Sequence, residues 1–395
     1  MEPLLPTTGR GELAELSAEI FRRSGELSAT LPSLAVRAGV AELVREMNSY
    51  YSNLIEGHKT LPRDIDRAMH DQHADSEEDR RNQFLSIAHI AVEKSMRQQL
   101  AEKSETAVFS ADFIQWLHQE FYQKLPPSEW FTTSLSGKRH PLEPGKLRNH
   151  QVVVGRHTPP DFQVLGDFLQ RFQRFYSDRA IPATDCLIAL AAAHHRLVWI
   201  HPFSDGNGRV ARLQSQAAMI SCGLDSSGLW TLSRGLARAR PTYFQLLQAA
   251  DQSRASDFDE RGNLSDCALA AFCRFFLERA LDQIDFMTGL ISPFKLVDRI
   301  ESYLRFVRVD LDSKMREHLA RLLKALCLEG ELPRGAVPAI LGLKDTAGRV
   351  IIRRALEEGL IKSTSPKGPL SIAFPHKVVD AYFPQLFTDL PVDDC

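Results

Sequence analysis

The stretch that decides the fold of this chain is His201-Pro-Phe-Ser-Asp-Gly-Asn-Gly-Arg-Val-Ala-Arg212. It combines an imidazole, a carboxylate, a Gly-Asn-Gly turn and two guanidinium groups within twelve residues. A lone Gly-x-Gly or a lone Arg pair would indicate only a turn or a solvated helix face. The complete string, preceded by an apolar helix, is instead typical of a site for a nucleoside triphosphate. A packed core rarely contains so many polar and charged side chains within twelve residues.

The first half of this stretch supplies a base and a metal ligand. His201 is a candidate general base, because an imidazole accepts a proton near neutral pH. Asp205 offers the hard carboxylate oxygen that suits Mg²⁺, which proteins usually hold with one or two carboxylates plus substrate phosphates.

The second half supplies groups that bind anions. Gly206 and Gly208 leave the backbone free to turn, and their amides, with that of Asn207, would point at an anion where a helix begins. Arg209 and Arg212 lie three residues apart, so they share one face of that helix. Because guanidinium groups bind phosphate oxygens bidentately, we expect these two residues to clamp a phosphate chain.

The whole string resembles the signature of the Fic domain family, His-x-Phe-x-[Asp/Glu]-Gly-Asn-Gly-Arg-x-x-Arg, at every fixed position. The resemblance implies transfer of AMP from ATP to a Ser, Thr or Tyr hydroxyl of a target protein, called AMPylation. It implies that His201 deprotonates the hydroxyl, that Asp205 holds Mg²⁺ and that Phe203 anchors the loop. The groups implied to bind phosphate oxygens are the amides of Gly206, Asn207 and Gly208 and the side chains of Arg209 and Arg212.

A second motif, Ser52-Asn-Leu-Ile-Glu56-Gly57, matches the inhibitory motif of the same family, [Ser/Thr]-x-x-x-Glu-[Gly/Asn]. The residues before it have helical periodicity and Gly57 suits a helix end, so we expect a helix over about 36–57. On that helix Ser52 and Glu56 face the same way. The resemblance implies that Glu56 pairs with Arg212 and denies this cation to the γ-phosphate. Taken alone, the motif would indicate only a glutamate at a helix end with no partner.

A third candidate element is Pro-Gly-Lys-Leu-Arg-Asn-His-Gln-Val-Val-Val-Gly-Arg-His-Thr-Pro-Pro, residues 144–160. Gln151–Val154 is short, β-branched and bounded by Gly and Pro, which predicts a strand of a small hairpin. The resemblance implies that this hairpin is the flap of Fic proteins, which pairs with the target segment as an added strand. Val152 and Val153 would lie in that strand, and Arg148 fits the family's flap arginine. An ordinary surface loop is the alternative.

The remaining pattern predicts a mainly α fold: a Fic-type helical bundle with a small β-hairpin flap, plus a C-terminal winged helix-turn-helix domain. We expect an N-terminal helical region over 1–105, a Fic catalytic core over 106–298 and the C-terminal domain over 299–395. Asp185–Val198 is apolar nearly all round and should be a central buried helix leading to His201. The other helices expected before the C-terminal domain are Glu12–Ser28, Arg81–Lys103, 110–124, Asp161–Tyr176, Val210–Cys222, Thr242–Ala250 and Ser265–Leu290.

The last hundred residues change character. The predicted elements form a winged-helix pattern. They are a helix, a short helix, a longer helix from Asp345 to Leu360, and two β-rich stretches around Pro366-Lys367-Gly368. Between Pro333 and Lys377, eight Lys or Arg residues stand against three Asp or Glu residues. This excess favours DNA binding, and the alternatives are a scaffold, a dimer contact or a target-binding platform.

Composition sets further limits. The chain has 44% hydrophobic and 25% charged residues, as soluble globular proteins do, and its net charge of −2 argues against wholesale nucleic-acid binding. The six cysteines form no Cys-x-x-Cys pair, so we expect free thiols rather than a zinc site or redox motif. No signal peptide or membrane-spanning stretch is visible, so we expect a cytoplasmic protein with no membrane partner.

Two function classes follow from these observations. The first is a Mg²⁺-dependent protein adenylyltransferase restrained by Glu56, with ATP and a target protein as partners and with self-AMPylation and a homodimer as open possibilities. The second is a winged-helix DNA-binding regulator whose helical core senses a nucleotide. Within the enzyme class, Glu56 could instead position a water that removes AMP.

Overall fold

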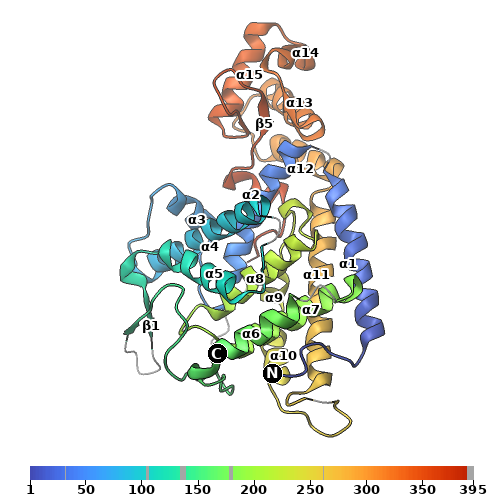
Figure 1. Cartoon of the computed structure of the whole chain (residues 1–395). Coiled ribbons are helices and arrows are strands. Elements are labelled where there is room, and N and C mark those ends of the chain that lie inside the picture. Colours follow the sequence, from blue (N-terminus) through green and yellow to red (C-terminus); the bar gives the residue numbers. More distant parts are fainter. Residues whose placement is uncertain (32, 104–105, 134–138, 178–180, 261, 389–395) are drawn as a thin grey trace.

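A computed structural model describes residues 1–388 except 32, 104–105, 134–138, 178–180 and 261. Within these residues the chain is mostly helical with two small antiparallel sheets (Figure 1), which confirms the predicted mainly α fold. The α-helices are α1 (Arg10–Thr30), α2 (Leu34–Ile55), α3 (Pro62–Met69), α4 (Glu77–Glu102), α5 (Ala111–Gln123), α6 (Leu165–Tyr176), α7 (Cys186–Ile200), α8 (Asn207–Ser221), α9 (Leu232–Arg238), α10 (Arg240–Ala250), α11 (Asp266–Leu290), α12 (Pro293–Phe306), α13 (Ser313–Glu329), α14 (Val337–Leu341), α15 (Asp345–Glu357) and α16 (His376–Tyr382). The strands are β1 (Phe131–Thr133), β2 (Arg139–Pro141), β3 (Glu331–Leu332), β4 (Ile361–Lys362) and β5 (Leu370–Ile372).

Helix α7 forms the centre of the body. Every residue from Leu187 to Leu197 is buried, because α6, α8 and α11 pack around this helix. That surrounding explains why its sequence is apolar nearly all round. Helix α11 runs beside α1 along one side of the body (Figure 1). As predicted, α7 leads directly to His201.

Side-chain caps fix where several helices begin. In each case a serine or aspartate side chain accepts a hydrogen bond from the backbone amide three residues further on, which satisfies one of the free amides of the first turn. The capping residues of this kind are Ser33, Ser76, Ser110, Ser265 and Asp312. Ser33 in this role sets the start of α2.

Helix α2 carries the second sequence motif. It packs along α4 and α9 and also contacts α8. Glu56 caps its C-terminal end, and Gly57 follows with a φ of 87°, in the left-handed region that favours glycine. The helix expected over about 36–57 is therefore present, and it ends where the sequence predicted.

The C-terminal helices lie at one end of the molecule, at the top of Figure 1. Helices α13, α14 and α15 accompany a three-stranded antiparallel sheet in the order β3-β5-β4. The helices and β-rich stretches expected here are present, and their identity as a winged helix stays a prediction. After α16 the chain returns to α2, where the hydroxyls of Tyr50 and Tyr51 donate to the carbonyl oxygens of Thr388 and Leu386.

The predicted strand Gln151–Val154 is wrong. This segment forms only one bridge, between Val154 and His157 around a tight turn at Gly155-Arg156. The two-stranded sheet instead pairs β1 with β2. A β-branched run becomes a strand only where a partner continues beside it, and here the prolines at 159 and 160 follow the turn too closely.

Two expectations from composition can be compared with the structure. Cys273 and Cys327 are buried free thiols, as expected, whereas Cys395 lies outside the described residues. None of the helices in the described ranges combines the length and the apolar character that a bilayer crossing requires.

Candidate active site

The polar stretch forms the loop that joins α7 to α8. His201 ends α7 with a φ of 49°, and Gly206 precedes α8 with a φ of 79°. A side chain at Gly206 would also crowd the ring of Tyr122, because its Cβ would lie 3.1 Å from the hydroxyl oxygen. The carboxamide of Asn207 closes the loop, since it donates to the carbonyl oxygen of Phe203 at 2.8 Å and accepts from the Phe203 amide at 2.9 Å.

Helix α5 supports this loop from one side. The ring of His118 stacks on Phe203 with centroids 3.9 Å apart. The hydroxyl of Tyr122 donates to Oδ2 of Asp205 at 3.1 Å, and the amide of Gly206 donates to Oδ1 at 2.7 Å. Sequence reasoning missed His118 and Tyr122, whose four-residue spacing on one helix was the only signal.

His201 is a buried imidazole at the start of this loop. Its Nδ1 is buried and has no hydrogen-bond partner among the described residues. Burial and the charge of Arg148 lower the pKa of His201 to about 4. The imidazole is therefore neutral at pH 7 and can take up a proton.

Arg209 is a buried cation with an unused donor. Its Nε meets no hydrogen-bond acceptor in the described part of the chain, and its guanidinium carbon lies 5.3 Å from the ring centroid of Phe121. Burial opposes its charge, but Asp205, Tyr122 and Glu56 together outweigh this effect and raise the pKa of Arg209. A permanently charged, buried donor without an acceptor is a feature of anion-binding sites.

Arg212 is tied to α2 by three hydrogen bonds. Its Nε donates to Oγ of Ser52 at 2.9 Å, and its Nη2 donates to the Ser52 carbonyl oxygen at 2.9 Å and to Oε1 of Glu56 at 2.6 Å. Burial disfavours the Glu56 carboxylate, but the charges of Arg212 and Arg209 prevail and lower the pKa of Glu56. The contact that the sequence predicted between Glu56 and Arg212 is therefore formed.

The carboxylate of Glu56 also lies over Gly208. A Cβ at this position would overlap Oε1 of Glu56 and would lie 3.1 Å from Nη1 of Arg212. The first turn of a helix is where an anion is stabilised by free amides and the helix dipole. In this structure the carboxylate of Glu56 lies at the first turn of α8, over Gly208.

These features agree with the family comparison, in which residues 108–218 match the model described as Fic/DOC family. This part of the chain is a Fic domain. Curated relatives named "Protein adenylyltransferase Fic" from Drosophila erecta and Drosophila melanogaster are 40% and 39% identical over 87 residues. Those matches cover 22% of this chain and 18% of either relative, so the chain matches less than a fifth of the length of these proteins.

Solved structures resemble more of the chain than the Fic domain alone. A Fic family protein from Desulfovibrio desulfuricans G20 matches with a TM-score of 0.55 at 17% identity, over 95% of this chain and 99% of that one. Fic-1 from C. elegans matches with a TM-score of 0.52 at 19% identity, over 71% of this chain and 72% of that one. At such identities the likeness shows the fold alone.

Arg148, the expected flap arginine of the Fic domain, braces the backbone. Its side chain is buried and donates only to carbonyl oxygens, and its own amide donates to Pro202 at 2.9 Å. The carbonyl acceptors of its guanidinium are those of His201, His150 and Pro160. Arg148 therefore joins the segment 144–160 to the loop between α7 and α8, and its donors are used by carbonyl oxygens.

The other residues of 144–160 lie beside the loop between α7 and α8, and several of them are exposed to solvent. Nε2 of His157 lies 2.7 Å from the carbonyl oxygen of Trp199 and fastens the segment to the end of α7. Val152 is half-buried and Val153 is 69% exposed. Within the described ranges the amides of these two valines meet no backbone acceptor. This edge has the free backbone groups that an added strand requires.

Asp205 is the metal-ligand candidate of the Fic domain. No group of three or more His, Cys, Asp or Glu side chains within the described residues could hold a metal ion on its own. A single oriented carboxylate nonetheless fits Mg²⁺, which keeps several waters and takes its other ligands from substrate phosphates.

Proposed function

We propose that this chain is a protein adenylyltransferase that transfers AMP from ATP to a Ser, Thr or Tyr hydroxyl of a target protein. The observation that carries the proposal is the presence, around one loop, of two buried unpartnered groups, Nδ1 of His201 and Nε of Arg209. The neutral imidazole that carries the first atom needs a proton to accept, and the second atom needs an anion. A protein hydroxyl and a triphosphate supply both, and the names of the curated relatives support the same activity.

In the proposed reaction, the neutral imidazole of His201 takes the hydroxyl proton while the hydroxyl oxygen attacks the α-phosphorus of ATP. The bond from this phosphorus to the bridging oxygen of pyrophosphate breaks. AMP–protein and pyrophosphate are the products. Arg209 and the first amides of α8 bind phosphate oxygens. Asp205 would hold Mg²⁺, which neutralises phosphate charge when it is bound.

Glu56 restrains this reaction in our proposal. Its carboxylate and the γ-phosphate of ATP compete for the guanidinium of Arg212 and for the space over Gly208. The Arg212 side chain is almost fully buried and cannot turn away, so ATP binds fully only when Glu56 leaves. A partner, a target or a change in dimerisation would then act by moving α2.

The test is labelling of the purified chain by ATP that is radioactive at the α-phosphate, with Mg²⁺ present. We expect weak labelling of the wild type, strong labelling of Glu56→Gly and none of His201→Ala. A parallel reaction with γ-labelled ATP separates AMP transfer from phosphate transfer, because only the latter moves that label. Equal α-labelling of all three proteins would overturn the proposal. Loss of AMP from a pre-labelled target that depends on Glu56 would support the removal of AMP instead.

DNA binding is a second candidate function, and it concerns the C-terminal helices. An open groove of about 640 Å³ is lined by four cationic residues and one aspartate: Arg334, Arg349, Arg353, Lys367 and Asp345. Phosphate contacts by such side chains make binding fall steeply with salt. We expect Arg349→Ala with Arg353→Ala to weaken DNA binding and reduce its salt dependence, with AMP labelling unchanged. DNA binding that is equally strong in this variant would contradict the assignment.

A further inference from the structure

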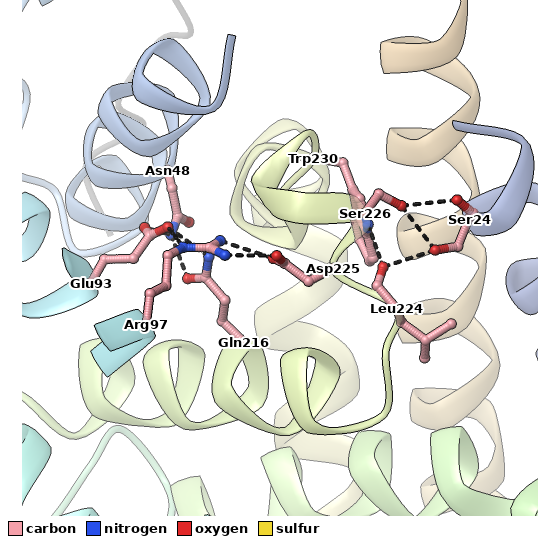
Figure 2. Close-up of polar contacts among 9 residues, drawn as sticks. All are labelled: Ser24, Asn48, Glu93, Arg97, Gln216, Leu224, Asp225, Ser226 and Trp230. Carbon is pink, nitrogen blue, oxygen red and sulfur yellow. Dashed lines mark hydrogen bonds and ion pairs between the residues drawn. The ribbon is translucent and has the colours of Figure 1, made fainter. Parts of the chain in front are cut away.

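A buried carboxylate outside the catalytic loop joins α2, α4 and α8 (Figure 2). Glu93 of α4 is 1% exposed and accepts hydrogen bonds from three side chains. The donors are Nδ2 of Asn48 at 2.7 Å, Nε2 of Gln216 at 2.9 Å and Nε of Arg97 at 3.0 Å. Such a charge is tolerated inside a protein only because these donors satisfy it.

Asn48 is the member of this network that belongs to α2, and its carboxamide is fully used. Nδ2 donates to Glu93 and also to Oε1 of Gln216 at 2.8 Å, while Oδ1 accepts from the hydroxyl of Thr231 at 2.6 Å. Because both ends of the amide have partners, its orientation is fixed. The side chain holds α2 against three other parts of the chain at a single point.

The position of Asn48 relative to the candidate active site gives this contact its meaning. Asn48 lies one turn before Ser52 on α2, and Gln216 lies one turn after Arg212 on α8. The same two helices are therefore bonded twice, once by Arg212 with Ser52 and Glu56 and once by Asn48 with Gln216. Together the two contacts fix the position of α2 along the axis of α8.

The opposite side of the network is anchored as firmly. Arg97 makes two hydrogen bonds to the carboxylate of Asp225, at 2.6 Å and 2.9 Å, in the turn that follows α8 (Figure 2). The neighbouring Ser226 donates to the Ser24 carbonyl oxygen at 3.0 Å on α1. Glu93 thus has a rigid frame, and α2 is aligned to this frame through Asn48.

We propose that Asn48 is a positioning residue that places the inhibitory helix: its bonds to Glu93, Gln216 and Thr231 set α2 at the height where Glu56 reaches Arg212. This inference rests on the proposed restraint of the enzyme by Glu56. Without the amide, the carboxylate of Glu93 and the hydroxyl of Thr231 each lose a partner, and both regain one only if α2 shifts and admits water. That shift withdraws Glu56 from Arg212.

The helix provides its own matched control. Asn53 is as buried as Asn48, but its carboxamide atoms have no hydrogen-bond partner among the described residues. Asn48→Leu and Asn53→Leu therefore make the same chemical change on the same helix, and only the first removes bonds of the network. Thr231→Val, which removes one bond to Asn48, is a milder second variant in case Asn48→Leu does not fold.

The experiment measures α-phosphate labelling and the affinity for ATP and for AMP, with and without Glu56→Gly in the same chain. We expect Thr231→Val, which removes one hydrogen bond, to raise labelling and ATP affinity up to about fivefold, the ratio for one ordinary hydrogen bond, and Asn48→Leu, which removes three, to raise them more. AMP affinity should not change, since AMP has no γ-phosphate for Arg212. Asn53→Leu should match the wild type, and Asn48→Leu should add nothing to Glu56→Gly.

Each other outcome has a separate meaning. Suppose that Glu56→Gly labels faster than the wild type, whereas Asn48→Leu labels no faster than Asn53→Leu. This result would overturn the role of Asn48. The same holds if Asn48→Leu accelerates labelling equally in the Glu56→Gly background, because the effect would then not act through Glu56. If Glu56→Gly itself is not activated, the proposed restraint fails first, and the inference about Asn48 fails with it.

Discussion

Glu56 and Arg212 form an ion pair whose two members differ in freedom. Nη2 and Oε1 are 2.6 Å apart, yet the side chain of Arg212 is 3% exposed and that of Glu56 is 30% exposed. Glu56 caps α2 and is followed by Gly57, so the carboxylate can leave toward solvent while the guanidinium stays in place. A ligand that binds Arg212 therefore has to displace the anion and need not rebuild the cation site.

The pH dependence of catalysis should reveal the environment of His201. Burial lowers its pKa from 6.5 to about 4, so the neutral, proton-accepting form persists down to about pH 4. We expect kcat/KM of the Glu56→Gly protein to show no step near pH 6.5, because burial keeps His201 neutral well below that pH. A loss of activity centred near pH 6.5 would contradict the assigned environment.

The same shift affects stability, with the sign that a depressed histidine pKa requires. Below about pH 6.5 the unfolded chain binds a proton that the folded His201 refuses. We expect the free energy of unfolding of the wild type to fall relative to that of His201→Gln as the pH drops from 6.5 toward 4. Urea unfolding of both proteins across this range measures the difference, and parallel curves would disagree with a buried, neutral imidazole.

Gly208→Ala should separate the two anions that compete for the first turn of α8. The added Cβ overlaps the carboxylate of Glu56, so the variant should lose the ion pair and show a lower Tm than the wild type. Adding Glu56→Gly should not lower the Tm further, because the ion pair is already lost and the clash is removed. ATP binding should stay weak in both, since the Cβ also occupies the phosphate position. A Gly208→Ala protein with the wild-type Tm would contradict the observed placement of Glu56.

Ser52→Ala tests how much of the Arg212 contact is due to the serine hydroxyl. The variant removes the acceptor of Nε but leaves the Ser52 carbonyl and the Glu56 carboxylate in place. We expect the chain to lose about 1 kcal/mol of stability and to label faster than the wild type but slower than Glu56→Gly. Labelling at the wild-type rate would show that the Ser52 carbonyl and the Glu56 carboxylate are enough to hold Arg212.

Tyr122→Phe tests the support of Asp205 by α5. The hydroxyl donates to one carboxylate oxygen, and its loss leaves that oxygen without an orienting partner. In a Glu56→Gly background we expect about tenfold more Mg²⁺ to be needed for half-maximal labelling. An unchanged Mg²⁺ titration for Tyr122→Phe would exclude Asp205 as a ligand that Tyr122 orients.

The sequence predicted those parts of the site whose determinants are local. A helix, a glycine-bounded loop and a second helix follow from residues 185–222 alone. The Glu56–Arg212 contact, which joins distant parts of the chain, was implied only by the resemblance of the two motifs to the Fic family. The supports of the loop could not be predicted in this way. His118 and Tyr122 on α5 have no local signature, and their roles depend on how α5 packs against α8.

The same distinction explains why the strand Gln151–Val154 was predicted wrongly and why the hydrogen-bond network around Glu93 was not predicted. The valines before Gly155 have strand propensity, but pairing depends on a partner that the turn and the prolines do not allow. Asn48 and Glu93 read as an ordinary polar residue and an ordinary charged residue on two amphipathic helices. Only the crossing of α2, α4 and α8 turns them into a buried polar network.

The most direct measurement is calorimetric titration of ATP with Mg²⁺ into the wild type and Glu56→Gly. The Glu56→Gly protein should bind ATP at least about tenfold more tightly than the wild type, because Arg212 and the space over Gly208 become free. Failure of Glu56→Gly to bind ATP at all, with Mg²⁺ present and the protein folded, would contradict the central claim that this loop is a nucleotide site which the chain's own carboxylate restrains.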